Sequence, residues 1–477
     1  MKNQKPHALL VKLYAFFGIP YLNHIPGPRG LKFFKLMLHF QRDSIGALEV
    51  TYRDYGPIVS YPWPVSTVII YNPKTIKQVL IDKNQNYLKG SQTEEMNVVM
   101  GQGLVTNNDR VSWLRNRTIV SRELGTKPIR GFSSIIDKFA TDMVFEWGKQ
   151  NSHKASSVVS ISTAMRNLTF SIAGKTLLGA NLSATDAEEV DEAVLFTSKM
   201  AHNHMFQLLP MPYWIPTPAN LKFHQHCRNL NRIVYRLINA EKNNLDKKYT
   251  PQSILERLVH AKDPETNLPL DDLTLRDEVL TLLIAGYETT SNTLSWVLGL
   301  IAAHPKIQKE IQQELDNEQA PIESTEFAKT YPLLYFSILE GIRLYTAIPM
   351  SSRKAISSDW FDHYFIPANT SVVIPVWVLH RDELYWDDPL VFKPERFRGV
   401  DINKLDTYIP FSKGSRRCVG EAFAIVEVAI IVSNILRSFD LALNAKTLPK
   451  AIAHVSLKPM NGLDLIIKSR THADADF

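Results

Sequence analysis

The segment 271–305 is the feature that most limits how this chain can fold. It reads DDLTLRDEVLTLLIAGYETTSNTLSWVLGLIAAHP, and although the chain has 27 prolines, none falls in this segment before its last position. Such a run predicts one long helix that ends at the proline. Apolar residues nearly surround this helix, so it is expected to lie buried through the middle of the protein. Gly286, Glu288, Thr289 and Thr290 interrupt the apolar surface.

Helical patterns dominate the chain from Val111 onward. Further helices are predicted at 332–346 and at 421–439, and the first of these stops before a proline. The segment 84–110 is polar and is expected to be irregular. These patterns predict a mainly α protein.

Strand patterns come from both ends of the chain. The segment 44–73 predicts a helix followed by a short hairpin, a further helix is expected near 75–83, and 360–380 is strand-like. The fold class is therefore mainly α with a small β region. No glycine/serine linker or low-complexity tract divides the chain. We expect a leader at 1–24 and a single domain at 25–477.

The leader is apolar from residue 8 to residue 22, but Lys12 and Pro20 interrupt it. It is shorter than the about 20 apolar residues that span a bilayer, and it lacks a small-residue cleavage site. It is expected to pack on the body of the protein, with peripheral membrane contact as the alternative.

The cysteine content indicates the cellular compartment of the protein, and its charge limits the classes of partner. Cys227 and Cys418 are the two cysteines of 477 residues, which makes no disulfide framework and favours a reducing compartment such as the cytoplasm. The net charge is +6 without a long basic run, so no nucleic-acid partner is expected. We expect a monomer.

The stretch PFSKGSRRCVG, residues 410–420, places one of these cysteines in a loop of glycine and arginine. A thiolate is a strong, soft ligand for iron. Gly414 and Gly420 let the backbone turn close to the sulfur, and a helix that starts near Val419 points its positive end at it. Cationic side chains beside the loop suit the carboxylates of a cofactor. The alternative is that Cys418 is a buried small hydrophobe.

The spacing of this loop separates the two interpretations. Phe411-x-x-Gly414-x-Arg416-x-Cys418-x-Gly420 fixes five positions in ten, a pattern expected by chance on the order of once in ten thousand chains. The stretch resembles the haem-binding loop of the cytochrome P-450 family, in which the cysteine thiolate is the proximal iron ligand. The resemblance implies haem b as the cofactor, with the cysteine as the metal ligand and the other four residues around it.

Two further motifs match the family in order. Residues 340–343 match its Glu-x-x-Arg motif, whose spacing puts both side chains on one helical face. Residues 394–397 look like its Pro-Glu-Arg-Phe segment. The resemblance implies a buried triad of Glu340, Arg343 and Arg396, which locks the scaffold of the cysteine loop and takes no part in the chemistry. Breaking such a triad leaves an unpaired charge.

A tryptophan and three arginines are candidate ligands of the haem propionates. Trp113-x-x-x-Arg117 resembles the C-helix motif of the family, and the spacing i, i+4 lets both side chains reach one propionate. Arg353 and Arg416 lie where the family often places further propionate partners. Each arginine taken alone would more often be a surface residue.

The long central helix carries Ala285, Gly286, Glu288 and Thr289, which look like the oxygen-activation motif of the family, Ala/Gly-Gly-x-Asp/Glu-Thr. The resemblance implies that the gap left by Gly286 admits a diatomic ligand and water above the iron. It also implies that Thr289 hydrogen-bonds bound oxygen and that Glu288 relays protons. The alternative for Thr289 is a bond back to its own helix.

The resemblance spans roughly residues 25–470 and implies a haem-thiolate monooxygenase that hydroxylates a lipophilic small molecule, such as a fatty acid, terpene or steroid, with O₂. Electrons come from a separate ferredoxin, flavodoxin or reductase, which Lys413 and Arg417 are expected to help dock. WIPTPAN, residues 214–220, resembles soluble bacterial members. The alternatives are an isomerase, dehydratase or peroxide-using enzyme, and a haem-based sensor.

Two sets of residues complete the expectations. The histidines at 202 and 204, and those at 224 and 226, are two apart on predicted helices and face different ways, so no zinc site is expected. By family position, the expected substrate contacts are apolar residues before the tryptophan motif, in a lid segment and after the Glu-x-x-Arg helix: Val98, Val99, Met100, Phe206, Leu208, Leu209, Ala347, Ile348 and Met350.

Overall fold

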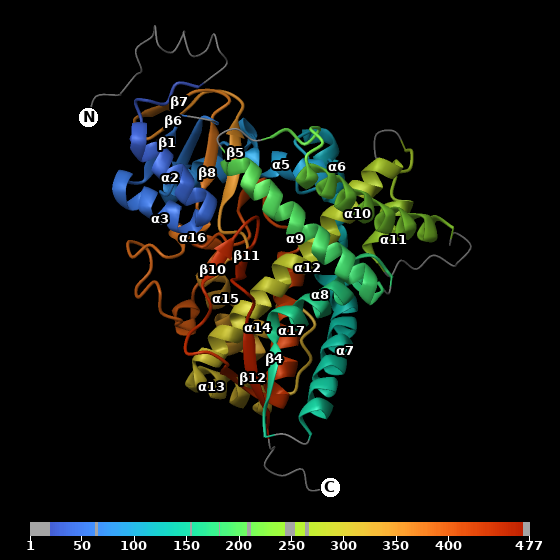
Figure 1. Ribbon diagram of the computed structural model, residues 1–477. Helices are drawn as coiled ribbons and strands as arrows, with labels where there is room; N and C mark the ends of the chain where they lie inside the picture. The colour runs from blue at the N-terminus through green and yellow to red at the C-terminus, as the bar shows by residue number, and fades with distance from the viewer. Residues whose placement is uncertain are drawn as a thin grey trace.

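The computed structural model describes residues 20–62, 65–152, 155–180, 182–207, 211–243, 253–262 and 267–470. Most of these residues are helical, which confirms the predicted fold class (Figure 1). The helices are α2 (Gly30–Arg42), α3 (Ser44–Tyr55), α4 (Pro73–Lys77), α5 (Ser91–Met100), α6 (Arg110–Glu123), α7 (Thr126–Asn151), α8 (Ile161–Leu177), α9 (Ala184–Phe206), α10 (Pro218–Lys242), α11 (Ile254–His260), α12 (Asp272–Ala303), α13 (Pro305–Asn317), α14 (Phe327–Thr330), α15 (Pro332–Leu344), α16 (Val376–Leu379) and α17 (Glu421–Ser438). Short turns of other helix types are η1 (Gln78–Asp82), η2 (Asn84–Asn86), η3 (Pro394–Phe397), η4 (Ile402–Lys404) and η5 (Gly414–Arg416).

The predicted central helix is α12, and it runs through the core. The Asp271 side chain accepts a hydrogen bond from the Thr274 N–H at its start, and Pro305 follows its end. Helices α8, α10, α15 and α17 pack around it. These helices pack on several sides of the middle of α12. They therefore hold in position the polar residues that interrupt its apolar surface.

The β structure comes from both ends of the chain, as the sequence predicts. The strands are β1 (Ile58–Tyr61), β2 (Thr67–Ile70), β3 (Tyr87–Lys89), β4 (Ser157–Ser160), β5 (Ser351–Ala355), β6 (Asp359–Phe361), β7 (Tyr364–Ile366), β8 (Ser371–Ile374), β9 (Phe439–Leu443), β10 (Ala451–Ala453), β11 (Leu457–Pro459) and β12 (Asp464–Ser469). One sheet has the order β1-β2-β8-β5-β3, and it lies with α2 and α3 at one end of the molecule (Figure 1). The hairpin β10–β11 reaches α12.

Two local predictions are wrong. The segment 84–110 is not irregular throughout, because β3 and α5 lie within it. Helix α5 is polar over its first turns and buries Val99 and Met100 only at its end, so its sequence lacks an apolar stripe. Residues 376–379 form α16 instead of a strand. All four are buried after Pro375, and this tertiary packing overrides their β-branched and aromatic composition.

The expectation for the leader falls mainly on residues 1–19, outside the part that the structure describes. Leu22 and Ile25 are fully buried in a cluster with β1, and the Arg29 guanidinium donates to both of their carbonyls. Residues 20–25 therefore pack on the body. Within the described segments, no helix combines the length and apolar character that a membrane crossing requires.

Candidate active site

The cysteine loop is folded tightly against η1. The Cys418 N–H donates to the Phe411 carbonyl at 2.9 Å and closes the turn. Gly414 has φ +74°, and a Cβ on it would lie 1.9 Å from the Leu80 carbonyl oxygen. A side chain cannot be accommodated there without moving backbone, so glycine is required both for its conformation and for the close approach of the two chains.

The sulfur of Cys418 faces a space inside the protein, because it lies deep in the fold and yet keeps exposed surface. Burial raises the pKa of this thiol. The Gly420 N–H, which bonds to the sulfur, and the charges of Arg117 and Arg417 oppose that rise, while Glu421 adds to it. Helix α17 begins directly after Gly420, so its positive end lies next to the sulfur. The loop thus supplies donors for a thiolate.

The expected tryptophan and arginines come together beside this loop. The guanidinium of Arg416 lies 4.3 Å from the centre of the Trp113 ring, and that of Arg117 lies 5.4 Å from it. Arg117 also donates to the Arg417 carbonyl at 2.7 Å. Burial, and after it the charge of Arg416, lowers the pKa of Arg353 to about 10. The three arginines therefore lie close enough for their positive charges to repel one another.

Lys89 is a fourth cation of this cluster, and the sequence did not reveal it. It is buried on β3, and its ammonium donates to the carbonyls of Leu104, at 2.5 Å, and of Val105. Burial lowers the pKa of Lys89 well below its usual value, and Arg416 and Arg353 lower it further. A lysine in a short strand gives no sequence signal, because its position depends on the pairing of β3 with the distant β5.

These four cations fit the propionates of a haem. Arg117, Arg353, Arg416 and Lys89 hydrogen-bond to carbonyl or hydroxyl oxygens, and within the described segments no carboxylate forms an ion pair with any of them. Four buried or half-buried cations without an ion-paired carboxylate are costly, and Glu278, whose charge raises the pKa of Lys89, offsets only part of this cost. Two carboxylates of a bound group would relieve this cost, and the neighbouring thiol suits iron. The residues present therefore fit a haem held by Cys418.

The polar face of α12 differs from the expectation at Thr289. Its hydroxyl donates to the carbonyl of Ala285 at 2.6 Å, so the bond back to its own helix is present. Ala285, Thr289 and Asn292 are partly exposed although most of the helix is buried, and their spacing puts them on one face. The Thr289 oxygen, having donated its proton, is left as a hydrogen-bond acceptor.

Gly286 does not make room above the cysteine loop. A Cβ on this residue would lie 3.0 Å from the Leu177 side chain, which belongs to α8. The small size of Gly286 therefore serves the close packing of α8 on α12. The sequence could not distinguish these two uses, because both require a glycine at this point of the helix.

Glu288 is half-buried, and its carboxylate points toward the β10–β11 hairpin. Its Oε1 accepts from the Ser456 hydroxyl at 2.8 Å, and the same hydroxyl oxygen accepts from the Asn292 amide at 3.2 Å. Burial raises the pKa of Glu288, while the Ser456 bond and the charge of Lys458 lower it. Ser456 and Lys458 were not predicted, since they lie in a hairpin more than 160 positions from Glu288.

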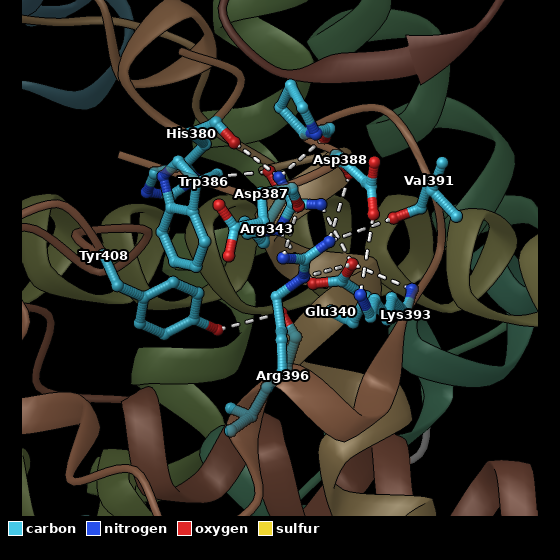
Figure 2. A network of polar contacts seen from close by, with 12 residues as sticks. Glu340, Arg343, His380, Trp386, Asp387, Asp388, Val391, Lys393, Arg396 and Tyr408 are labelled. Carbon is cyan, nitrogen blue, oxygen red and sulfur yellow. Dashed lines mark hydrogen bonds and ion pairs between the residues drawn. The ribbon is translucent and has the colours of Figure 1, made fainter. Parts of the chain in front are cut away.

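The expected triad of Glu340, Arg343 and Arg396 is assembled in the core (Figure 2). Arg343 binds both carboxylate oxygens of Glu340, at 2.7 and 2.9 Å, and the Arg396 Nε donates to Oε1 at 2.9 Å. Arg343 also donates to the His380 carbonyl at 2.5 Å, and the Lys393 N–H donates to Glu340. These bonds join α15 to η3 and to the chain after α16.

The expected substrate contacts are only partly grouped. Phe206 stacks on Phe40 at 5.4 Å between ring centres, so it packs against α2. Met350 is buried in a cluster with Trp377, away from the cysteine. Val98 is exposed on α5, whereas Val99, Met100, Ala347 and Ile348 are buried or half-buried. Leu208 and Leu209 lie outside the described residues.

The two expected docking cations are already paired within the chain. Lys413 binds Asp406 at 3.1 Å, and Arg417 binds both oxygens of Glu421, at 2.5 and 2.7 Å. Lys413 is also mostly buried. Their charges are therefore offset, and the sequence alone did not show this.

The histidines at 204 and 224 form hydrogen bonds within the chain. Within the described segments no three His, Cys, Asp or Glu side chains gather as a metal site. His204 binds Glu95 at 2.9 Å and His224 binds the Tyr213 carbonyl at 3.0 Å. These contacts hold α9, α10 and the segment between them.

A thiol at the start of helix α17, beside four cations that suit propionates, defines a candidate haem-thiolate site. The family model for cytochrome P450 matches residues 25–465 of this chain. The chain therefore belongs to the cytochrome P450 family. It is an oxidoreductase of the monooxygenase type, and its cofactor is haem b, iron protoporphyrin IX.

The relatives of this chain include bacterial and mammalian proteins. A Mycobacterium tuberculosis protein with the provisional name cytochrome P450 135A1 is 27% identical, over 92% of this chain and 96% of that protein. Lithocholate 6-beta-hydroxylase of Mesocricetus auratus is 26% identical, over 94% and 91%. The bifunctional cytochrome P450/NADPH–P450 reductase 2 of Bacillus subtilis is 27% identical, over 87% of this chain and 40% of that protein. Members of the family use O₂ and electrons from a reductase partner.

Proposed function

We propose that this protein hydroxylates a lipophilic small molecule, such as a fatty acid, terpene or steroid, with O₂ and with electrons from a separate redox protein. The observation that carries the proposal is the cluster of cations, Lys89, Arg117, Arg353 and Arg416, beside the loop that holds Cys418. One relative is named a hydroxylase of lithocholate, which supports hydroxylation as the reaction.

The bound haem would supply the oxygen chemistry, in which one oxygen atom of O₂ enters a C–H bond. The chain contributes orientation and protons. Cys418 would hold the iron, and Lys89, Arg117, Arg353 and Arg416 would hold the propionates and so fix the plane of the ring.

The proton supply would pass through the side of α12. Because Glu288 is half-buried and its pKa is raised, its carboxyl group retains a proton more readily than an exposed one. The Ser456 hydroxyl, which donates to Glu288, would link this carboxyl group to the proton supply, and the Asn292 amide, which donates to the same hydroxyl oxygen, would hold the hydroxyl in place. Thr289, as an acceptor on the neighbouring turn, would receive a hydrogen bond from the oxygen side.

Two further parts of the proposal concern the source of the electrons and the cellular compartment. The relative from Bacillus subtilis is named as a fusion with a reductase, which supports a ferredoxin, flavodoxin or reductase as the source of the electrons here. With two cysteines and no disulfide framework, we place the reaction in the cytoplasm.

The first test is the absorption spectrum of the reduced protein with carbon monoxide, recorded beside a Cys418→Ala variant. We expect a Soret band at the red-shifted thiolate position in the wild type and its loss in the variant. A wild-type band at shorter wavelength would show that the thiolate is not the ligand and would contradict the proposal. Product formation from a panel of fatty acids, terpenes and steroids, with an added ferredoxin and its reductase, then tests the reaction itself.

A further inference from the structure

A second cavity lies away from the haem-thiolate site. It has a volume of about 710 Å³ and lies between α3, the end of α12, the end of α15, α16 and the chain that leads into β10. Neither Cys418 nor the α12 residues above it lines the cavity. The lining residues are Asp43, Ile45, Gly46, Glu49, Leu300, His304, Leu344, Tyr345, Trp377, Arg381, Leu390, Val391, Phe392, Leu448, Pro449, Lys450 and Ala451. We call this cavity the α3–α16 cleft.

Arg381 is the unusual group of the α3–α16 cleft. Its guanidinium lies 3.2 Å from the centre of the Trp377 ring and 5.3 Å from that of Tyr345. Its Nη1 is buried and has no hydrogen-bond partner. In the part of the chain that the structure describes, no carboxylate forms an ion pair with it. Stacking on aromatic rings offsets only part of the cost of taking a guanidinium out of water.

The acids of the cleft do not compensate this charge by direct contact. Glu49 accepts a hydrogen bond from the Trp377 indole at 2.6 Å, and it influences Arg381 only from a distance. Asp43 is paired with Lys450 at 2.8 Å. Burial lowers the pKa of Arg381 to about 9, in keeping with a cation that lacks a close anion.

The α3–α16 cleft is open on one side and combines an apolar wall with charged groups, Asp43, Glu49 and Lys450, beside Arg381. Side chains of Leu300, Leu344, Phe392 and Leu448 form the wall together with the two aromatic rings at Arg381. A concave surface with an apolar wall and a few polar groups is the usual construction of a small-molecule site, in which the wall provides affinity and the polar groups orient the ligand. A guanidinium recognises a carboxylate with two parallel hydrogen bonds.

We propose that the α3–α16 cleft is a second ligand site, which binds a small molecule with a carboxylate head and an apolar, aromatic or aliphatic body. The carboxylate pairs with Arg381, and the body lies against the apolar wall. This site is separate from the monooxygenase reaction, and its occupancy does not depend on the identity of the oxidised substrate. A ligand that binds only the folded protein also stabilises it.

The test uses the haem-loaded full chain and a matched pair of probes, 4-phenylbutyrate and the neutral 4-phenylbutanamide. Isothermal titration calorimetry gives both dissociation constants, and the Soret band is recorded during each titration. We expect the acid to bind at least about ten-fold more tightly than the amide, as one charge-assisted pair provides. The Soret band should not move, because the cleft is separate from the haem.

Three variants locate the binding. Arg381→Met should remove the preference for the acid, and Lys446→Met, which removes an exposed cation that does not line the cleft, should leave it within about two-fold. Leu390 lines the cleft but is 72% exposed, so Leu390→Asp adds a repelling charge without disturbing the core and should weaken binding of the acid alone. If Arg381→Met does not fold, Leu390→Asp tests by itself whether the acid binds in the α3–α16 cleft.

Two results would overturn the proposal. One is equal affinity for acid and amide in the wild type. The other is an affinity for the acid that is unchanged in Leu390→Asp and is accompanied by a shift of the Soret band, which would place the ligand over the haem.

Discussion

Lys89 and Arg353 lie directly opposite each other on the paired strands β3 and β5, and both are buried. Like charges in facing positions of a sheet are destabilising. The arrangement is favourable only when an anion lies between or beside them. The fold therefore keeps a local electrostatic cost that binding of the haem propionates would repay.

Lys89→Met tests this relationship. We expect the haem-free variant to be at least as stable as the haem-free wild type, since one of two facing charges is gone, and the haem-loaded variant to lose haem about ten-fold faster, as expected for one charge-assisted hydrogen bond. Transfer of haem to apomyoglobin measures the rate, and thermal unfolding measures the stability. Lys354→Met is the control, because Lys354 is on the paired strand β5 and its side chain is 41% exposed. A slower or unchanged loss in Lys89→Met would contradict the role.

Glu340→Gln should be the most destabilising of the polar substitutions considered. It leaves Arg343 and Arg396 without their shared anion in a site from which water is excluded. Removal of one partner from a buried ion pair costs about 3–5 kcal/mol. Urea unfolding and haem content are the measurements. Glu395→Gln, which breaks the exposed pair with Arg398 next to the triad, should leave both unchanged. Similar behaviour of the two variants would show that the triad does not lock the scaffold.

A comparison of Gly414→Ala with Gly399→Ala distinguishes the stability cost of backbone strain from that of a steric clash. Both glycines have positive φ, +74° and +71°, but only Gly414 has backbone within reach of an added Cβ. Gly399→Ala should cost about 1 kcal/mol for the left-handed conformation. Gly414→Ala should cost clearly more and lower the haem content, because the loop must move away from Leu80. The thermal midpoint and the haem-to-protein ratio report the difference, and equal costs would refute the requirement at Gly414.

Glu278 is buried on α12, and its raised pKa predicts that the free energy of unfolding depends on pH. Its carboxylate accepts from the Asn116 amide at 2.7 Å and from the Leu104 N–H at 3.1 Å. Burial is the largest cause that raises its pKa from 4.5 to about 7. Between these values the folded protein holds a proton that the unfolded chain has lost, so stability falls as pH rises, by about 1.4 kcal/mol per pH unit and about 3 kcal/mol in total.

Glu278→Gln removes this dependence. The unfolding midpoint of the wild type should therefore fall relative to that of the variant between pH 5 and pH 7, and the difference should be constant above pH 7.5. Thermal unfolding of both proteins in the same buffers gives the comparison, in which the other titrating groups cancel. Parallel curves across this range would show that Glu278 does not carry the shifted pKa.

Ser456→Ala tests the proposed proton supply. Loss of the hydroxyl removes the link between Glu288 and Asn292. We expect product formed per NADH consumed to fall about ten-fold, at the low end of what positioned proton transfer contributes. Thr293→Val is the matched control, since its hydroxyl bonds back to the Thr289 carbonyl inside α12 at 2.9 Å. An equal effect of both variants would point to a general disturbance of the helix.

The sequence by itself determined the parts of this protein that are local. The spacing of Phe411, Gly414, Arg416, Cys418 and Gly420 predicts the cysteine loop, because a tight turn beside a thiolate restricts each of these positions. The long apolar run without proline predicts α12, because helix formation depends on residues three and four apart. The family and the cofactor follow from such local patterns.

The tertiary structure decided which distant residues meet. Lys89 joins the cations because β3 pairs with β5, and Ser456 meets Glu288 because the β10–β11 hairpin reaches α12. Gly286 serves the packing of α8, and Phe206 packs on α2, for the same reason. Burial then shifts the pKa of groups such as Lys89, Glu278 and Arg353. Pairing, packing and desolvation are properties of the three-dimensional surroundings, which no stretch of sequence contains.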